Sequence, residues 1–476
     1  MFIKQTILRT LACVARAVNA RTLALSGLAV AGVALAGNRY VSPDGDNSTG
    51  KSTYHTPFRT LGTALKGLEP GDTVFILPGI HKVSKEDISR VYGKGPYAVI
   101  FDLDMSGEKG KPMVIKGVCD EDGNRPVFDF SDVTLSDEAN PEGYRITGFL
   151  VSGNHLKLSD FECTGIRVTR TDHTQSENIR ISNGAYNTIE NVACHDGMGI
   201  GVYINNDSHH NLIVNCDGYN NYDPVSDISP KTGMGYGGNN DAFGCHVKGG
   251  MEGNIFIGCR GWNNSDDGFD LINCYSPVEI SYCIALKSGY DADGTSRGDG
   301  NGFKAGGFSM KPRDVALHEG EAPRHLVANC VAADNKANGI YSNHHLGGVD
   351  FICNTSVDNV RSQYCMVNRK GKEKDANVDV EGYGHFLCGN LSVSSEDNHT
   401  LWTPQPIERD AILTSREKGT ISLTPLKMPR LADGSLQPAT IDYIDSLRQD
   451  GAGADFSGYD KAIREARHIS GADTGN

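Results

Sequence analysis

The chain has 476 residues, 57 of them glycine, and a formal net charge of −14. An acidic surface repels nucleic acid and anionic membranes, so neither is expected as a partner. An acidic polymer would also be repelled unless a cation lay in its binding site. The glycines concentrate among Asn and Asp in the middle of the chain, a pattern typical of many tight turns between short strands.

Residues 1–36 have the pattern of an export signal. Four basic residues, the last of them Arg21, precede an apolar run over residues 23–36, and Ala34-Leu35-Ala36 is a small-x-small cleavage site. The run is shorter than the roughly 20 residues that a membrane-spanning helix needs. We therefore predict cleavage near Ala36 and a mature chain that is secreted, periplasmic or on the cell surface.

Residues 37–115 are expected to form an N-terminal cap and the first coils of a solenoid, with a short helix at about 57–68 between two strands. Such a cap would cover core and strand edges that a bare terminal coil exposes.

Residues 116–400 repeat with a period near 23. Short apolar strands end in cysteine at this spacing, and longer gaps contain glycine-rich stretches at 220–240 and 288–301 that we interpret as inserted loops. The pattern predicts an all-β chain folded as a right-handed parallel β-helix. The cysteines that define the period are Cys194, Cys216, Cys259, Cys283, Cys330 and Cys353.

The cysteine contexts favour buried free thiols over disulfides, because each cysteine lies in a short apolar strand where it acts as a small hydrophobe. The neighbouring Asn191, Asn215 and Asn329 are expected to turn corners in the left-handed conformation. After about residue 400 the period fades. Residues 401–476 are predicted to be an irregular tail that caps or packs, with a short helix near 460–468. The protein is expected to act as a monomer.

Four segments share one position of the repeat, and aligning Phe243, Phe269, Phe303 and Ile340 stacks four consecutive coils. Residues that flank an inward side chain in a strand point outward. The alignment therefore predicts that Asp270 and Lys304 lie in one outward column on neighbouring coils, and that Asp241 and Asp267 share a second position.

The aligned coils gather four carboxylates, Asp241, Asp266, Asp267 and Asp270. Unpaired, they would repel one another, and a hard divalent cation with oxygen ligands would remove the repulsion. Flexible sites of several carboxylates favour Ca²⁺ over Mg²⁺. The alternative is a solvated acidic turn, since Asp-Asp-Gly is ordinary turn chemistry.

Lys304 lies beside this cluster in a glycine-rich strand. Most lysines are solvated surface charges, but a nearby cation and partial burial would both lower the pKa of Lys304. A neutral lysine can act as a general base.

These motifs resemble polysaccharide lyase family nine, which includes pectate and rhamnogalacturonan lyases, over roughly residues 38 to 400. The resemblance rests on Asn240-Asp241, the run from Asn264 to Asp270, Asn301-Gly-Phe-Lys304 and the stretch from Gly347 to Ser356. It implies a β-helix in which the four aspartates bind calcium and Lys304 is the base.

The implied reaction is β-elimination on the galacturonate backbone of pectin, either rhamnogalacturonan I, which the inserted loops slightly favour, or homogalacturonan. The alternatives are a glycoside hydrolase that uses the aspartates as acid and base, and a glycan-binding solenoid without catalysis. Further candidates for contact with the sugar, each also an ordinary surface residue on sequence grounds, are His246, Arg313, His344, His345 and Arg369.

Overall fold

The computed structural model describes residues 37–49, 52–93, 96–133, 136, 138, 141–307, 323–345, 347–366, 384–393, 412–416 and 422–470. The predicted signal peptide lies outside the described residues, as do Arg313 and Arg369.

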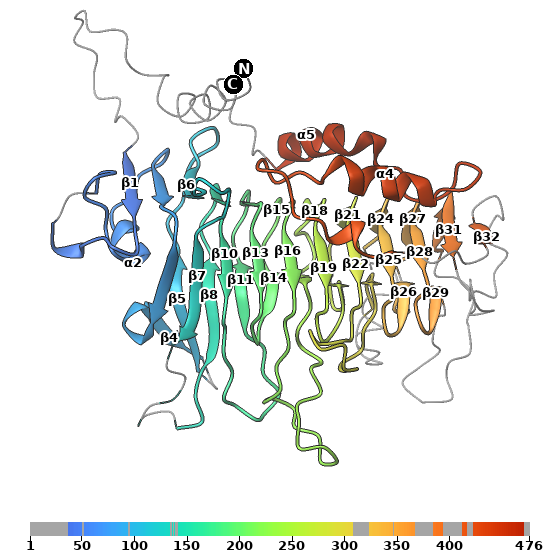
Figure 1. Cartoon of the computed structure of the whole chain (residues 1–476), viewed down its shortest axis with the longest axis horizontal. Coiled ribbons are helices and arrows are strands. Elements are labelled where there is room, and N and C mark those ends of the chain that lie inside the picture. Colours follow the sequence, from blue (N-terminus) through green and yellow to red (C-terminus); the bar gives the residue numbers. More distant parts are fainter. Residues whose placement is uncertain are drawn as a thin grey trace, which may run out of the picture. The chain divides into compact units, whose positions relative to one another are not determined.

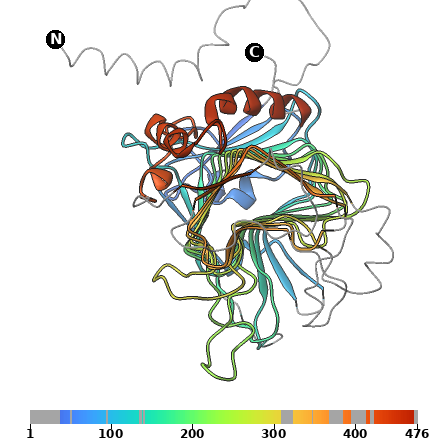
Figure 2. The same ribbon diagram turned by 90° about the vertical axis from the view of Figure 1, so that its right-hand side faces the viewer.

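The described chain winds through three parallel sheets, and each full coil contributes one strand to each of them (Figures 1 and 2). The fold is the predicted parallel β-helix. Sheet 1 contains, in spatial order, β1 (Asn38–Val41), β2 (Thr73–Ile76), β6 (Met113–Gly117), β9 (Leu156–Ser159), β12 (Thr188–Glu190), β15 (Leu212–Val214), β18 (Asn254–Ile257), β21 (Val278–Ser281), β24 (His325–Ala328), β27 (Val349–Ile352) and β30 (Phe386–Cys388).

Sheet 2 follows sheet 1 along each coil. It contains β3 (Ile80–Ser84), β7 (Val127–Asp132), β10 (Glu162–Thr164), β13 (Ala193–His195), β16 (Asp217–Tyr219), β19 (Arg260–Trp262), β22 (Ile284–Leu286), β25 (Val331–Ala333), β28 (Thr355–Val357), β31 (Asn390–Val393) and β32 (Ile412–Arg416).

In each coil, a loop leads from the strand of sheet 2 to the strand of sheet 3. Sheet 3 carries the candidate site. Its edge pair β4–β5 is antiparallel, whereas its other ladders are parallel. It contains β4 (Arg90–Tyr92), β5 (Tyr97–Leu103), β8 (Arg145–Val151), β11 (Glu177–Ser182), β14 (Ile200–Asn206), β17 (Phe243–Val247), β20 (Phe269–Asp270), β23 (Phe303–Lys304), β26 (Asn338–Tyr341) and β29 (Ser362–Cys365).

The helices lie near the two ends of the described chain. The expected helix at 57–68 is shorter than predicted, because only Leu61–Ala64 are helical. Gly62 is a weak helix former, and Gly67 has a φ of 68°, which ends the turn. The helices are η1 (Asn47–Thr49), α2 (Leu61–Ala64), η2 (Lys85–Asp87), η4 (Pro425–Lys427), α4 (Pro438–Leu447), η5 (Phe456–Gly458) and α5 (Tyr459–Ile469).

Identical side chains stack between coils and fill the interior. The rings of Phe243 and Phe269 lie 4.9 Å apart, and those of Phe269 and Phe303 lie 4.8 Å apart, each pair close to parallel. Both separations match the spacing of paired strands, about 4.8 Å. The predicted corners are confirmed, since Asn191, Asn215 and Asn329 all have φ between 52° and 55°.

The cysteine register was predicted only in part. All twelve described cysteines are free, as expected, and Cys216, Cys259, Cys283 and Cys330 each directly precede a strand of sheet 2. Cys194 does not share this column, because it lies inside β13 opposite Gly218. Asn354, not Cys353, takes the equivalent position in the next coil. The near-regular spacings arise because Cys194 lies two residues after this column and Cys353 lies one residue before it.

The C-terminal tail packs along the flank of the coils. Helices α4 and α5 lie beside the strands (red in Figure 1), and Leu426, Ile444 and Tyr459 join an apolar cluster with strand residues such as Ile257 and Leu286. Helix α5 confirms the helix expected near 460–468, whereas α4 was not predicted.

Hydrogen bonds from residues 454–467 of the tail reach successively earlier coils as the chain proceeds. The Ala454 amide donates to Thr355 Oγ1 (2.8 Å) and the Asp455 amide donates to Asn329 Oδ1 (3.1 Å). Farther along, Tyr459 donates to Asn215, and Arg467 pairs with Glu190. Residues 454–467 therefore span many coils in the direction opposite to their stacking.

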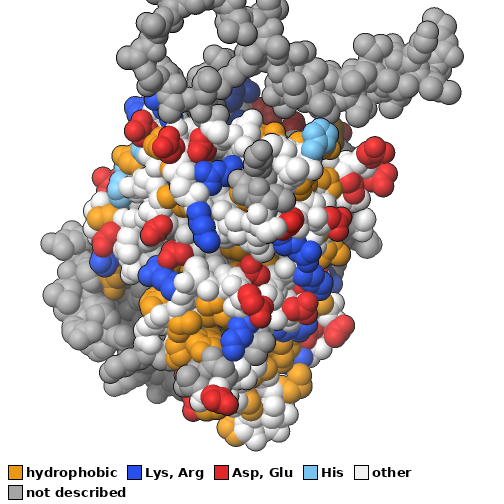
Figure 3. Space-filling model, turned by 90° about the vertical axis from the view of Figure 1, so that its left-hand side faces the viewer, with side chains coloured by type: hydrophobic (Ala, Val, Ile, Leu, Met, Phe, Trp, Pro, Cys, Tyr) orange, Lys and Arg blue, Asp and Glu red, His pale blue; other side chains and the backbone are white. Residues whose placement is uncertain are grey.

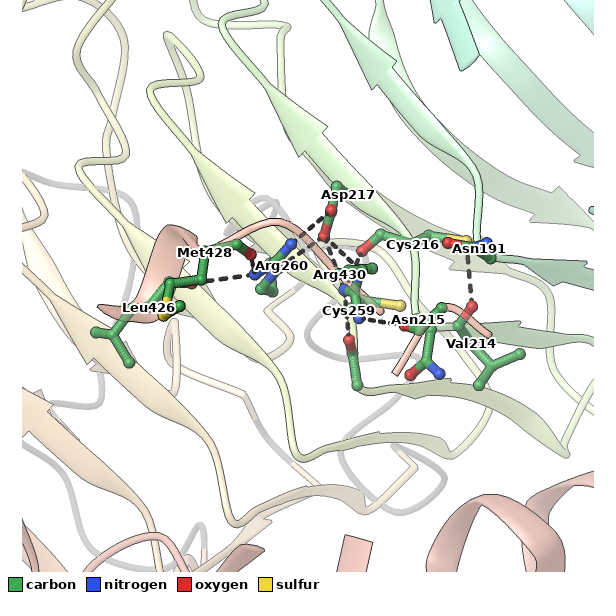
Figure 4. A network of polar contacts seen from close by, with 12 residues as sticks. Asn191, Val214, Asn215, Cys216, Asp217, Cys259, Arg260, Leu426, Met428 and Arg430 are labelled. Atoms are coloured by element: carbon green, nitrogen blue, oxygen red, sulfur yellow. Dashed lines mark hydrogen bonds and ion pairs between the residues drawn. The ribbon is translucent and has the colours of Figure 1, made fainter. Parts of the chain in front are cut away.

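A buried ion network joins the tail to sheet 2 (Figure 4). Asp217 pairs with the Nη2 atoms of Arg260 (2.8 Å) and Arg430 (2.7 Å), and all three side chains are at most 7% exposed. Arg430 also donates to the carbonyl of Gly258 (2.8 Å). Burial alone would raise the pKa of Asp217, but the two guanidinium groups outweigh it and hold that pKa far below its ordinary range.

Replacing Asp217 with alanine is expected to lower the free energy of unfolding by about 3–5 kcal/mol, because it leaves two buried guanidinium groups without their counter-ion. The low pKa implies that this stabilisation is complete above the ordinary aspartate pKa of about 3.9 and is lost as the pH falls below it. Urea unfolding would measure both effects. Asp207→Ala is the control, since its exposed pair with Lys248 should contribute about 0–1 kcal/mol. Equal losses for the two variants would contradict this role of Asp217.

Candidate active site

The predicted alignment of the coils is confirmed in sheet 3. Phe243 pairs with Phe269, Phe269 with Phe303 and Phe303 with Ile340. The phenylalanines point into the core, with at most 1% of their surface exposed. Asp270 therefore lies opposite Lys304 on the outer face of neighbouring strands, as the column predicted.

The predicted carboxylates meet in two groups that share one member. Asp241, Asp267 and Asp270 have carboxylate oxygens within 4.8 Å of one another, and so do Asp266, Asp267 and Asp299. Asp299 was not predicted, because it belongs to the loop 288–301 that interrupts the repeat, and spacing alone cannot place a loop residue. Its backbone amide donates to Asp266 Oδ1 at 2.7 Å, which fixes the loop against the cluster.

Each carboxylate of the first group uses one oxygen for positioning. Asp241 Oδ1 accepts from the Asp267 amide (3.0 Å), and Asp270 Oδ1 accepts from the Ile272 amide (2.7 Å). Asp267 Oδ1 accepts from the backbone and side-chain nitrogens of Asn301, at 2.6 and 2.8 Å. One oxygen of each carboxylate is thus held in place, while the second oxygens of Asp267 and Asp270 face Lys304.

The cluster is electrostatically unfavourable without a cation. Burial and the neighbouring carboxylates raise the pKa of Asp241 and Asp266 well above the ordinary value. Burial, with the charges of Asp270 and Asp299, raises the pKa of Asp267 to about 6, although Lys304 opposes the shift. A set of hard oxygen ligands that repel one another fits Ca²⁺, which takes six to eight oxygens in flexible geometry.

Lys304 lies against the same oxygens. Its Nζ is 3.0 Å from Asp267 Oδ2 and 3.1 Å from Asp270 Oδ2. Burial alone would lower the pKa of Lys304, but the surrounding carboxylates outweigh it and raise that pKa well above the ordinary value. Burial lowers the pKa of Lys304 as expected, but the four carboxylates outweigh it, and the lowering by a bound cation stays a prediction.

The predicted histidines have different surroundings. His246 lies on β17, where Nδ1 is 3.0 Å from the Tyr203 hydroxyl, and Nε2 is buried with no hydrogen-bond partner among the described residues. His344 contacts the Tyr341 hydroxyl through Nε2 at 2.8 Å. His345 is fully buried, accepts from the Gly307 amide at 3.1 Å and lies 2.6 Å from the Pro323 carbonyl, so it supports the backbone instead of facing a sugar.

Residues 39–377 match the family model described as "Pel9A-like, right handed beta helix region". The chain belongs to this family. Its membership confirms both the handedness of the β-helix and the resemblance to polysaccharide lyase family nine, and the protein is a polysaccharide lyase.

Proteins named as pectate or rhamnogalacturonan lyases align with most of this chain. Pectate lyase L of Dickeya chrysanthemi is 31% identical over 360 residues, which are 75% of this chain and 71% of that protein. A solved rhamnogalacturonan lyase is 36% identical with a TM-score of 0.73, over 88% of this chain and 99% of that one. The crystal structure of pectate lyase Pel9A is 27% identical with a TM-score of 0.58, over 85% and 88%.

In the described part of this lyase, no helix has the length and apolar character that a membrane crossing requires.

Proposed function

We propose that this lyase cleaves the galacturonate-containing backbone of a pectic polysaccharide by Ca²⁺-dependent β-elimination, with Lys304 as the general base. The observation that carries the proposal is the position of Lys304 Nζ, about 3 Å from two carboxylates of a buried cluster that fits a divalent cation. The relatives named as pectate and rhamnogalacturonan lyases support a pectic substrate.

Asp241, Asp267 and Asp270 would hold the cation, with Asp266 beside them. Bound there, Ca²⁺ would neutralise the carboxylate of the sugar and acidify the proton on C5. The backbone amides that fix Asp241 and Asp270 keep these ligands in place before the substrate arrives. Preorganisation of this kind lowers the cost of assembling charge around a reacting group.

Lys304 would remove the C5 proton. The electron pair left on C5 forms the C4–C5 double bond, and the C4 oxygen leaves with the departing sugar and takes a proton from solvent. Lys304 must be neutral to accept a proton, and the carboxylates now hold it protonated. Once they ligate a cation, Asp267 and Asp270 present less negative charge to Nζ, so the pKa of Lys304 falls. Lys304 thus becomes a base when the metal site is filled.

Rhamnogalacturonan I is the favoured polymer. The rhamnogalacturonan lyase is the more similar of the two solved relatives in both identity and TM-score, and it is covered almost entirely by this chain. We also propose that the mature protein is exported after cleavage near Ala36 and acts as a monomer.

Assays of the purified enzyme on rhamnogalacturonan I and on polygalacturonate, with Ca²⁺ present, are expected to give a faster rise in ultraviolet absorbance on rhamnogalacturonan I. The absorbance reports the conjugated double bond that elimination creates and hydrolysis does not. Reducing-end release without this absorbance would favour the hydrolase alternative. A faster rate on polygalacturonate would overturn the assignment of the polymer, and inactivity on both would overturn the pectic substrate.

A further inference from the structure

The outer face of sheet 3 carries arginine and tyrosine side chains on the coils that precede the acidic cluster. The strand register places Arg180 opposite Tyr203, Tyr203 opposite Gly244, and Gly244 opposite Asp270. Arg180 is thus in the same outward column as Lys304, four strands earlier. At about 4.8 Å per strand, the two backbone positions are about 19 Å apart.

Arg180 is held between two aromatic rings. Its guanidinium carbon lies 5.7 Å from the ring centre of Tyr97 and 5.8 Å from that of Tyr203, within the range of cation–π contact. The two rings confine the guanidinium group and leave 14% of the side chain exposed. A fixed and partly exposed guanidinium is suited to bind a carboxylate through two parallel hydrogen bonds.

The hydrogen-bonding capacity of Arg180 is largely unused. Among the described residues its one hydrogen bond runs from Nη1 to Glu177 Oε1, and it is long, at 3.4 Å. Nε is buried with no hydrogen-bond partner in the described chain. Arg145, which also lies over Tyr97, differs: it donates to Thr174 (2.6 Å) and to the His173 carbonyl (3.0 Å). Arg180 is therefore the arginine of this group that is left with donors for a ligand.

Glu177 is a weak counter-ion for Arg180. It is fully buried, its Oε2 accepts from the Thr147 hydroxyl at 2.9 Å, and burial raises its pKa. A further carboxylate bound to this guanidinium would therefore belong to a ligand that arrives from solution. Toward the edge of the sheet, Arg90 lies over Tyr92, and Tyr92 stacks on Tyr97. Figure 3, which views this end, shows hydrophobic side chains gathered beside lysine and arginine side chains.

We infer that Arg180, between Tyr97 and Tyr203, forms a binding subsite for a carboxylate of the uronate polymer, several sugars away from the bond that Lys304 breaks. The inference rests on the proposed function. In a protein of net charge −14, a guanidinium with unused donors on the face that carries the cluster attracts an acidic chain. The partly exposed ring of Tyr97 offers an apolar surface to a sugar next to that carboxylate.

The test compares substrates of different length. Arg180→Gln is expected to raise KM for the long polymer about 10- to 100-fold with kcat unchanged, since a hydrogen-bonded charge is lost from binding alone. The shortest oligomers that the wild type cleaves cannot reach Arg180, so their kinetics should not change. Arg180→Lys keeps the charge without the planar fork, so its KM for the long polymer should lie between those of the wild type and Arg180→Gln. It replaces the glutamine variant in the test if that variant does not fold.

Arg125→Gln is the matched control. Arg125 is comparably buried, with 18% of its side chain exposed, but it pairs with Glu162 of sheet 2. Its replacement should therefore not affect the kinetics on long substrates more than the kinetics on short ones. Equal losses on long and short substrates would make Arg180 a structural residue and overturn the subsite, as would unchanged kinetics on both. Wild-type activity on the polymer, measured beside these variants, tests the proposed function separately.

Discussion

Replacing Lys304 with arginine is expected to lower kcat by about 10²–10⁴-fold, the usual contribution of a positioned general base. Arginine keeps the positive charge beside Asp267 and Asp270 but cannot be deprotonated in a protein. The variant should therefore stay folded, with its charge balance intact, and lose elimination. The increase in ultraviolet absorbance on the preferred polymer would measure the loss.

Lys248→Arg is the control for this substitution, because Lys248 is 60% exposed and pairs with Asp207 away from the cluster. It should retain full activity. If Lys304→Arg kept most of its turnover, Lys304 would bind a substrate carboxylate, and the base would lie elsewhere. His246 would be the first alternative, since its Nε2 has no hydrogen-bond partner among the described residues.

The pH profile gives a second measurement on the same residue. The neutral form of Lys304 is the active one, so kcat should rise with pH until that pKa is passed. The carboxylates raise the pKa of Lys304 well above its ordinary value, and a bound cation reduces their charge. Higher Ca²⁺ concentrations should therefore move the midpoint of the rise to lower pH. If the midpoint did not change with Ca²⁺ concentration, the base would not be coupled electrostatically to the metal site.

Removing Ca²⁺ with a chelator is expected to lower activity about 10³-fold or more, because stabilisation of the charge on the sugar carboxylate contributes several kcal/mol. Asp267→Asn should reproduce most of this loss at moderate Ca²⁺ concentrations, since Asp267 belongs to both carboxylate groups. Added Ca²⁺ should restore the chelated wild type fully and the variant incompletely. Full activity after exhaustive chelation would remove the metal from the mechanism.

Thermal unfolding provides a readout that does not depend on catalysis. Ca²⁺ should stabilise the wild type by about 2.7 kcal/mol at a concentration 100 times its Kd, and it should stabilise Asp267→Asn much less. Without Ca²⁺, Asp267→Asn should be at least as stable as the wild type, because it removes one of the mutually repelling charges while asparagine can still accept from Asn301. Asp293→Asn, an exposed position in the same loop, should behave as the wild type.

The sequence predicted the part of the site that follows the repeat. Phe243, Phe269 and Phe303 point inward once per coil, so the outward neighbours Asp270 and Lys304 could be placed from spacing alone. Asp299 could not, since it comes from a loop whose path is set by contacts that no period encodes. The protonation of Lys304 was also missed, because it depends on distances to four carboxylates that a linear pattern does not contain.

The cysteines show that spacing along the sequence also does not determine strand register. Cys194 fits the spacing of the series but lies in a different column from Cys216, because a shift of two residues within a strand barely changes the spacing. Strand pairing, which is decided by backbone hydrogen bonds, resolved the ambiguity.

The C-terminal tail changes how this solenoid would come apart. A stack of coils whose contacts are only between neighbours can fray from its open end, one coil at a time. Here residues 454–467 hold coils from Thr355 back to Glu190, so peeling off the last coil also pulls on coils far inside the stack. The tail thereby turns a series of independent local openings into one cooperative event. Arg430, which completes the buried network around Asp217, also belongs to the tail. The cooperativity is therefore absent until the C-terminal tail has been synthesised.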